Sequence, residues 1–293
     1  MANLKEVRTR IASVSSTQQI TSAMKMVSAA KFRRAQNSII GMRPYAAQLG
    51  EIVDGIDVGD GVNTPYHEQR RVSRILIVVV TSNKGLCGAF NSNVLKQADQ
   101  RLSHYRSQYP DAEVEIVTIG KRAADYYAKR KEYKQSNKSD ILDTPTFDAV
   151  AALADSIMSQ FCNKEYDLVE IVYNQFKNSL TQILSVEQFL PVAPHTATQA
   201  AKGGQVPHDY IYEPDKESIL REMVPLTLRS QFYRVVLDSL AAEHGARMTA
   251  MQKATDNAEE LLKELKLSYN KARQASITNE IIEIVSGSEA LKG

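Results

Sequence analysis

The feature that most constrains this chain is an uninterrupted helical pattern near its C-terminus, from Leu226 to Val285. It contains no proline and only one glycine, Gly245. Mostly apolar residues recur in steps of three and four, the heptad pattern of a helix that winds around another helix. The predicted seam comprises Leu237, Leu240, His244, Arg247, Met251, Ala254, Ala258, Leu261, Leu265, Ser268, Ala272, Ala275, Asn279 and Ile282. At ~1.5 Å per residue the run would span roughly 90 Å, so we expect a partner along its length.

The N-terminal segment carries a second helical pattern and is the expected partner. The same spacing relates Leu4, Val7, Ile11 and Val14. The apolar spacing then shifts, as at a stutter where local winding changes, to Ile20, Ala23, Met24, Val27 and Ala30. The pattern continues to Val53, and Pro44 is expected to kink or interrupt it. Two long amphipathic helices at the two ends predict an antiparallel coiled coil, with the middle of the chain forming a domain on one flank.

The middle of the chain alternates between β-rich and helical patterns, which predicts an α/β layer domain. We expect strands at Ile75–Val80, Val114–Ile119, Leu168–Tyr173 and Thr181–Phe189, the last two as a hairpin-like pair, and an edge strand within 131–143. Helices are expected to start at Asn91 or Ser92, at Lys121, at Thr144-Pro145 and after Asp215. Pro225 is expected to separate the helix after Asp215 from the long C-terminal one.

The fold class is therefore α/β: a long antiparallel coiled coil of the terminal helices plus a Rossmann-like middle domain. The predicted divisions are 1–57 for the N-terminal coiled-coil helix, 74–193 for the α/β domain, 194–214 for a linker and foot, and 215–293 for the C-terminal coiled-coil helix.

Charge is balanced over the chain but concentrated near its N-terminus. Lys and Arg total 36 against 34 Asp and Glu, a net charge of +2 that gives no reason to expect nucleic-acid binding. Within residues 1–43, however, eight basic residues oppose only Glu6, a local excess of +7. This stretch is either a solvated helix face or a surface that faces an acidic partner.

Several kinds of site find little support in the sequence. Cys87 and Cys162 lack metal or redox spacing, which fits a reducing compartment, and no two of the five histidines have ligand spacing, so no metal site is expected. No secretion signal or transit peptide precedes Leu4. The longest strongly apolar run, Ile75–Val80, is much too short to cross a bilayer. A link to a membrane would therefore go through a partner.

The turn Gly85–Asn91 follows a predicted buried strand and precedes a helix, where phosphate-binding loops occur. It matches neither GxGxxG nor GxxxxGK[ST]. No acidic residue lies at the end of the next predicted strand, where it would bind the ribose of a nucleotide. A tight strand-to-helix turn is therefore favoured over a nucleotide site, and Cys87 is a weak candidate for a nucleophile.

Two features of the C-terminal helix are unusual for a simple zipper. His244 and Arg247 fall on the seam, where buried charge costs stability unless it is paired, so they mark a place where the seam opens or meets another chain. The last turns carry a broad apolar face, which suggests insertion into another protein, although Leu4–Val14 could cover part of it. This face consists of Ile277, Ile281, Ile282, Ile284 and Val285.

The patterns described so far leave two alternatives: a coiled-coil structural adaptor and a nucleotide-dependent enzyme built on the α/β domain. Short motifs along the whole chain point to one family more specifically. The chain resembles the gamma subunit of F-type ATP synthases of the bacterial type. The resemblance rests on Arg10–Val14, Thr17, Ile20-Thr21, Ala23–Val27, Gly85–Gly88, Ala246–Met251, Asn270–Ala275 and Ile277–Ser288.

This resemblance implies a central rotor shaft that couples proton flow through a membrane c ring to conformational change at catalytic sites on beta subunits. It implies three alpha and three beta subunits around the shaft, an epsilon subunit and the c ring as partners. It implies no catalytic residue, cofactor or metal on the chain itself. The expected location is peripheral, on the cytoplasmic face of the bacterial inner membrane.

The matching motifs also imply site residues. Contacts with the catalytic ring and coupling roles are expected for Arg247, Arg273, Gln274, Thr278 and Glu280, and for Met24 and Lys25 on the opposite helix. The foot that meets epsilon and the c ring is expected to include Tyr210 and Glu213.

Overall fold

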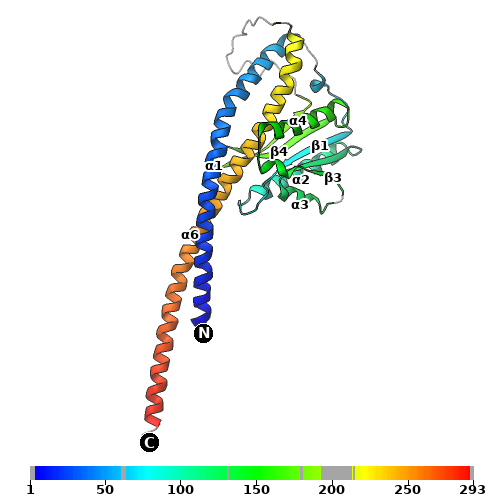
Figure 1. Cartoon of the computed structure of the whole chain (residues 1–293). Coiled ribbons are helices and arrows are strands. Elements are labelled where there is room, and N and C mark those ends of the chain that lie inside the picture. Colours follow the sequence, from blue (N-terminus) through cyan, green and yellow to red (C-terminus); the bar gives the residue numbers. More distant parts are fainter. Residues whose placement is uncertain are drawn as a thin grey trace. The chain divides into compact units, whose positions relative to one another are not determined.

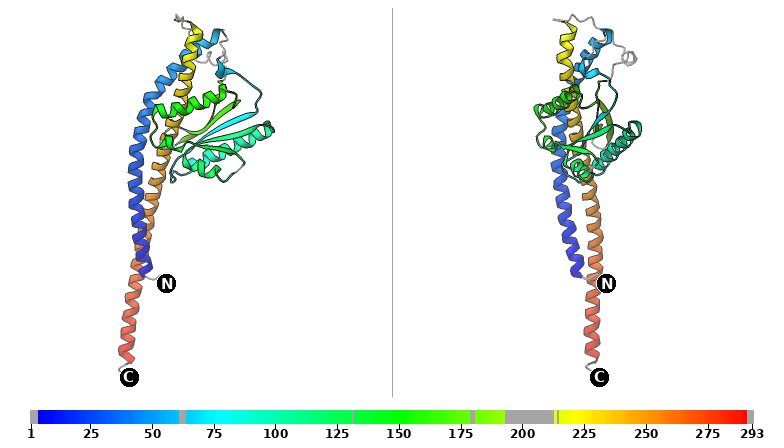
Figure 2. Two further views of the ribbon diagram at one scale, coloured as in Figure 1. Left: turned by 45° about the vertical axis from the view of Figure 1, so that its right-hand side comes forward. Right: turned by 90° about the vertical axis from the view of Figure 1, so that its right-hand side faces the viewer.

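The computed structural model describes residues 4–60, 64–130, 132–178, 181–192, 213 and 215–290. The chain divides into two compact units, one of Met1–Ser28 with Met248–Gly293 and one of Ala29–Arg247. Its two long helices are α1 (Leu4–Asp60) and α6 (Lys216–Ala290), which are antiparallel where they pair in the first unit (Figures 1 and 2). No helix among the described residues is long and apolar enough to cross a membrane.

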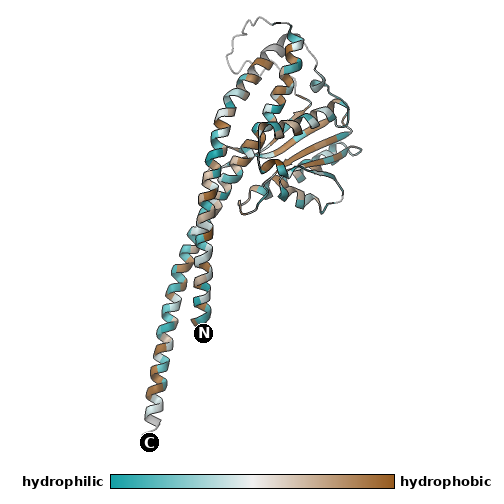
Figure 3. Cartoon of the chain, in the orientation of Figure 1, coloured by the Kyte–Doolittle hydropathy of each residue, from teal (hydrophilic) through white to brown (hydrophobic). Residues whose placement is uncertain are grey.

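The second unit contains a five-stranded sheet with the order β3-β2-β1-β4-β5. Its strands are β1 (Arg74–Val80), β2 (Glu113–Ile119), β3 (Lys134–Asn137), β4 (Leu168–Phe176) and β5 (Gln182–Leu190). The first four are parallel, and β5 pairs antiparallel with β4. The central strand β1 is buried on both faces, as its continuous apolar sequence predicts (Figure 3). The predicted α/β class is confirmed, with β3 as the expected edge strand.

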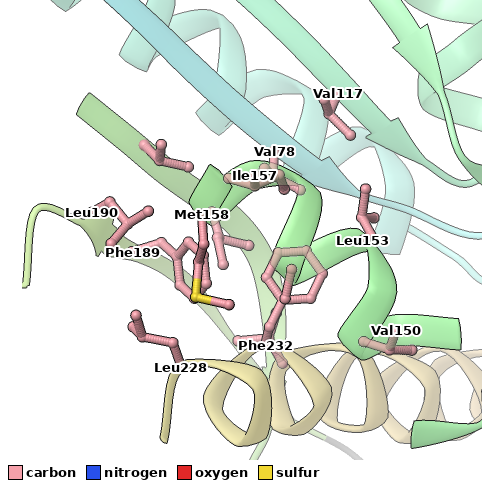
Figure 4. Packing of buried hydrophobic residues seen from close by; sticks show 14 of the residues in the cluster. Val78, Val117, Val150, Leu153, Ile157, Met158, Phe189, Leu190, Leu228 and Phe232 are labelled. Atoms are coloured by element: carbon pink, nitrogen blue, oxygen red, sulfur yellow. The ribbon is translucent and has the colours of Figure 1, made fainter. Parts of the chain in front are cut away.

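Helices cover both faces of this sheet. Alternate residues of β1 point to opposite sides, and from Ile75 onwards both sets are apolar and buried. Ile75, Ile77 and Val79 pack beneath α2 (Phe90–Gln108) and α3 (Lys121–Tyr127). On the other face, Val78 and its neighbours pack against α4 (Phe147–Cys162) and the first part of α6, where Phe232 is fully buried (Figure 4). α4 ends at Cys162, whose thiol is exposed, whereas Cys87 is buried.

Neither proline inside the long helices ends its helix. Pro225 lies within α6, and Pro44 lies within α1, so the predicted separation of two helices at Pro225 is wrong. Core packing explains the continuity at Pro225. Leu220, Val224 and Leu228 are buried at intervals of four residues on both sides of it, and this common apolar face outweighs the backbone hydrogen bond that proline removes.

Two predicted helix starts also need correction. α4 begins after Thr146, whose side chain accepts a hydrogen bond from the Ala149 amide at 3.4 Å, so Thr144-Pro145 precedes the cap instead of forming it. Asn91 lies inside the first turn of α2 and does not cap it. Its Oδ1 instead accepts a hydrogen bond from the Ser82 amide at 3.0 Å, because the loop before α2 folds back over this side chain.

The seam of α1 in the first unit is continuous, so the predicted stutter is wrong. A heptad spacing relates the buried or half-buried residues Leu4, Val7, Ile11, Val14, Gln18, Thr21, Lys25 and Ser28. Ile20 and Val27 are instead 60% and 57% exposed. The heptad continues through polar residues, because Thr21 and Thr255 share a hydrogen bond of 2.8 Å across the seam, and hydrophobicity alone could not reveal this register.

The seam of α6 lies one residue later than predicted along part of its length. Leu262 is buried and Leu261 is 44% exposed, and the predicted seam residues Ser268 and Ala275 are also exposed. From the start of the first unit onwards, the observed seam includes Met251, Thr255, Ala258, Leu262, Leu265, Tyr269, Ala272 and Ser276. Adjacent leucines at 261 and 262 fit either register, so apolar spacing could not choose between them.

Candidate coupling surfaces on the long helices

The last described turns of α6 form an exposed apolar tip. Every residue from Ile277 to Ser288 is exposed, and in the first unit these turns continue beyond the N-terminal end of α1 (Figures 1 and 2). The alternative in which Leu4–Val14 covers this face is therefore wrong for the described residues. The apolar tip consists of Ile277, Ile281, Ile282, Ile284 and Val285, which are 48–71% exposed.

Four predicted site residues lie beside the apolar tip on the same helix. Arg273, Gln274, Thr278 and Glu280 are all exposed. At 3.6 residues per turn, steps of three and four place Arg273 and Glu280 along one line with Ile277, and Gln274 and Thr278 along the next. The Thr278 hydroxyl donates to the Gln274 carbonyl at 2.9 Å. The helix thus presents an apolar patch with hydrogen-bonding and charged groups at its margin.

The two predicted site residues on α1 lie next to an exposed apolar stripe. Met24 and Lys25 are half-buried, whereas Ile20, Met26 and Val27 project outward and are 57–69% exposed. A groove of about 370 Å³ runs beside them, lined by Gln18, Gln19, Ser22, Ala23, Met26 and Thr255. The apolar spacing predicts Ile20 and Val27 on the seam, so this exposed surface does not follow from the sequence pattern. Apolar spacing carried no signal for this surface, because the seam runs through Thr21 and Thr255.

The basic excess of the N-terminal region lies largely on exposed side chains. Lys31, Arg33 and Arg34 are all exposed on α1. The ion pair between Arg10 and Glu6, with Nη2 and Oε1 3.0 Å apart, is also solvent-exposed, so it neutralises one charge and contributes little to stability. This part of α1 therefore has a positive electrostatic potential on a surface that a partner can reach.

Arg247 differs from the other predicted site residues because it is buried. Its Nη1 donates to Glu243 Oε1 at 2.6 Å and to His244 Nδ1 at 3.3 Å. Its Nη2 donates to the Lys84 carbonyl at 2.8 Å, and Nε donates to the Gly85 carbonyl at 3.3 Å. The buried charge of Arg247 is therefore paired, and the described partners all lie within this chain.

Burial shapes the ionisation of the groups around Arg247. Burial, reinforced by the positive charges of Arg247 and Lys31, lowers the pKa of His244 to about 4. His244 is therefore neutral near pH 7, as its acceptor role toward Arg247 requires. Burial raises the pKa of Glu243, and Arg247 and Lys31 act in the opposite direction. The cluster is an enclosed ion pair with a neutral imidazole beside it.

The loop between β1 and α2 is built to accept hydrogen bonds from Arg247. It directs the Lys84 and Gly85 carbonyls at the guanidinium, whereas a phosphate would need backbone amides there. Burial also raises the pKa of the Cys87 thiol, which keeps it protonated and poorly nucleophilic. This geometry favours a structural turn over a nucleotide or catalytic site.

The predicted foot is not assembled by the described residues. Glu213 is exposed, and Tyr210 lies outside the described residues. Most of the predicted linker, 194–214, also lies outside them. Among the residues described, there is no group of three or more His, Cys, Asp or Glu side chains arranged to hold a metal ion.

Comparison with known proteins shows which family the chain resembles. A family model described as ATP synthase matches residues 3–291. The ATP synthase gamma chain of Flavobacterium johnsoniae is 52% identical over 295 residues and covers all of both chains. A chain in the central stalk and c-ring structure of the Tetrahymena thermophila mitochondrial ATP synthase is 25% identical, with a TM-score of 0.58 over 80% of this chain and 99% of that one. A chain in the rotor of the Euglena gracilis mitochondrial ATP synthase has a TM-score of 0.66 at 20% identity over 94% and 98% of the two chains, which supports the fold.

Proposed function

Because the chain belongs to the ATP synthase gamma chain family, we propose which of its surfaces couple rotation to catalysis. As a gamma chain it is a non-catalytic subunit and the central shaft of the enzyme's rotor. In this proposal, proton flow through the c ring turns the shaft, and the turning shaft changes the conformations of catalytic sites on the beta subunits. The chain needs no cofactor of its own for this role, because its contribution is mechanical.

The apolar tip of α6 is proposed to sit inside the ring of three alpha and three beta subunits. A helix end with five exposed apolar side chains is costly in water and becomes favourable inside an apolar sleeve. The polar margin formed by Arg273, Gln274, Thr278 and Glu280 would supply directional contacts with the ring. Apolar contacts are non-directional, so they let the shaft rotate inside the ring. The directional polar contacts make the interaction between shaft and ring depend on the rotation angle.

The basic, partly apolar outer face of α1 is proposed to meet acidic segments of the beta subunits, with Met24 and Lys25 at its inner edge. Several like charges on one face attract an acidic partner more strongly than isolated ion pairs do. Arg247 keeps a coupling role in this proposal, but its described contacts lie within the chain.

Residues 194–214 are proposed to connect to the membrane sector. The division into 1–57, 74–193, 194–214 and 215–293 assigns the linker and foot, with Tyr210 and Glu213, to contacts with epsilon and the c ring. The proposed location is peripheral, on the cytoplasmic face of the bacterial inner membrane.

The exposed apolar tip is the observation that carries this proposal, and co-purification with the ring tests it. The tagged full-length chain should recover alpha and beta subunits, and a chain truncated after Ser276 should recover far less of both. A matched control is Arg221→Ala on the same helix, which removes only an exposed pair with Glu217. Equal recovery by the truncated and full-length chains would show that the tip does not hold the ring.

A further inference from the structure

Arg247 joins two segments that are far apart in the sequence but both lie in the second unit. It reaches from α6 to the Lys84 and Gly85 carbonyls, more than 160 residues away. The same guanidinium is held from its own helix by Glu243, which is also buried. Because Nη1, Nη2 and Nε all donate within the chain, few of the donors of Arg247 remain for an external partner.

The loop that receives Arg247 lies where an α/β sheet usually binds its ligand. In doubly wound sheets, ligands bind beyond the carboxyl ends of the strands, where the strand order reverses. Here that point lies between β1 and β4, because the chain leaves β1 for β2 on one side and later returns to β4 on the other. The loop follows β1 directly and offers carbonyl oxygens, so it suits a planar cation with several N–H donors instead of a phosphate.

The backbone of this loop is held in a restricted shape. Leu86 has φ of 62° and Gly88 has φ of 61°, and a left-handed conformation at a non-glycine residue is sustained only when its surroundings impose it. The Ser82 hydroxyl donates to the Lys84 carbonyl at 2.7 Å, and Asn91 Nδ2 donates to Cys87 Sγ at 3.1 Å, so the loop has restraints of its own. Arg247 adds two more from α6, at the Lys84 and Gly85 carbonyls.

We propose that the Lys84–Gly88 loop is a guanidinium-binding site occupied by Arg247 of the same chain, which makes Arg247 a positioning residue that fixes the β1–α2 loop on α6. Its contribution to coupling then comes from holding the α/β domain to the shaft helix, and no ring contact by Arg247 is needed. Force applied to the α/β domain would pass to α6 at this point in addition to the apolar core contacts of α6.

Chemical rescue in the assembled ATP synthase tests the proposal. Arg247→Ala should raise the hydrogen-exchange rate of the 83–89 amides by roughly tenfold or more, because two carbonyl contacts that restrain the loop are lost. It should also lower ATP-driven proton pumping more than ATP hydrolysis. Millimolar methylguanidinium should restore both the loop protection and the pumping, whereas methylammonium at the same concentration should not.

Two further variants keep the test decisive. Arg247→Lys keeps the charge but loses the fork that spans two carbonyls, so it should assemble, show intermediate loop exchange and gain nothing from methylguanidinium. Arg221→Ala, an exposed arginine on the same helix, should leave loop exchange unchanged. The exchange measurement does not depend on ring contacts, so it tests this inference even if the proposed function is wrong. Unchanged loop exchange in the Ala and Lys variants, or equal rescue by methylammonium, would overturn the proposal.

Discussion

Removing two isoleucines from the apolar tip should weaken binding to the ring without destabilising the free chain. Ile281 and Ile282 are 55% and 56% exposed. Fully burying an isoleucine is worth about 1.5–3 kcal/mol, so burying the exposed half is worth about 1 kcal/mol for each. The Ile281→Ala and Ile282→Ala pair should therefore cost about 2 kcal/mol of binding free energy, or roughly a 30-fold increase in dissociation constant.

The control is a leucine-to-alanine change on the same helix at a buried position. Leu262→Ala should cost the free chain about 2–4 kcal/mol of stability, because it leaves a cavity at a buried seam position. Alanine favours helix, so the double isoleucine variant should lose no helicity.

Titration of the purified ring with each full-length chain gives the dissociation constants, and urea unfolding followed by circular dichroism gives the stabilities. The reasoning fails if the double variant binds as tightly as the wild type, or if it unfolds as readily as Leu262→Ala.

Three further results are expected. Asp167→Ala should destabilise the α/β domain by about 3 kcal/mol, measured by urea unfolding, because its carboxylate accepts three hydrogen bonds at the start of β1; an unchanged midpoint would contradict this. Replacing Arg273 and Gln274 with alanine should lower ATP hydrolysis by the purified complex and leave its subunit composition intact, and unchanged turnover would remove them from the coupling surface. Burial raises the pKa of Asp238 above its ordinary value of 3.8, so its contribution to stability falls as the pH rises through the folded-state pKa and is regained on acidification. Asp238→Asn should flatten the pH dependence of the urea midpoint on the acidic side of neutrality, and an unchanged slope would contradict the assignment.

The sheet could be predicted from sequence because burial on both faces leaves a local signature. The run Ile75–Val80 is continuously apolar, and it forms the central strand. The exposed tip was also predictable, since apolar residues continue to the end of a helix that has run past its partner. Both features depend on residues that are close together in the chain.

The register of the coiled coil and the role of Arg247 depend on contacts that sequence spacing does not contain. Thr21 occupies a seam position because Thr255 faces it, and a polar residue gives no sign of this on its own. Arg247 could be identified as unusual for a seam, but its acceptors lie in a loop more than 160 residues earlier. Pairing over such a distance is decided by the folded topology.

The contrast between the two thiols makes this rotor subunit easy to tag. Cys87 is enclosed, whereas Cys162 is open to solvent at the end of α4, so a maleimide dye should attach at one defined position without any engineered cysteine. Burial raises the pKa of the Cys162 thiol above its ordinary value, so mildly alkaline buffer should speed the reaction by increasing the thiolate fraction. The chain also contains no tryptophan, so a tryptophan introduced at any chosen position would be its only indole fluorophore. A subunit whose function is rotation thus carries a natural site for a probe of its angle.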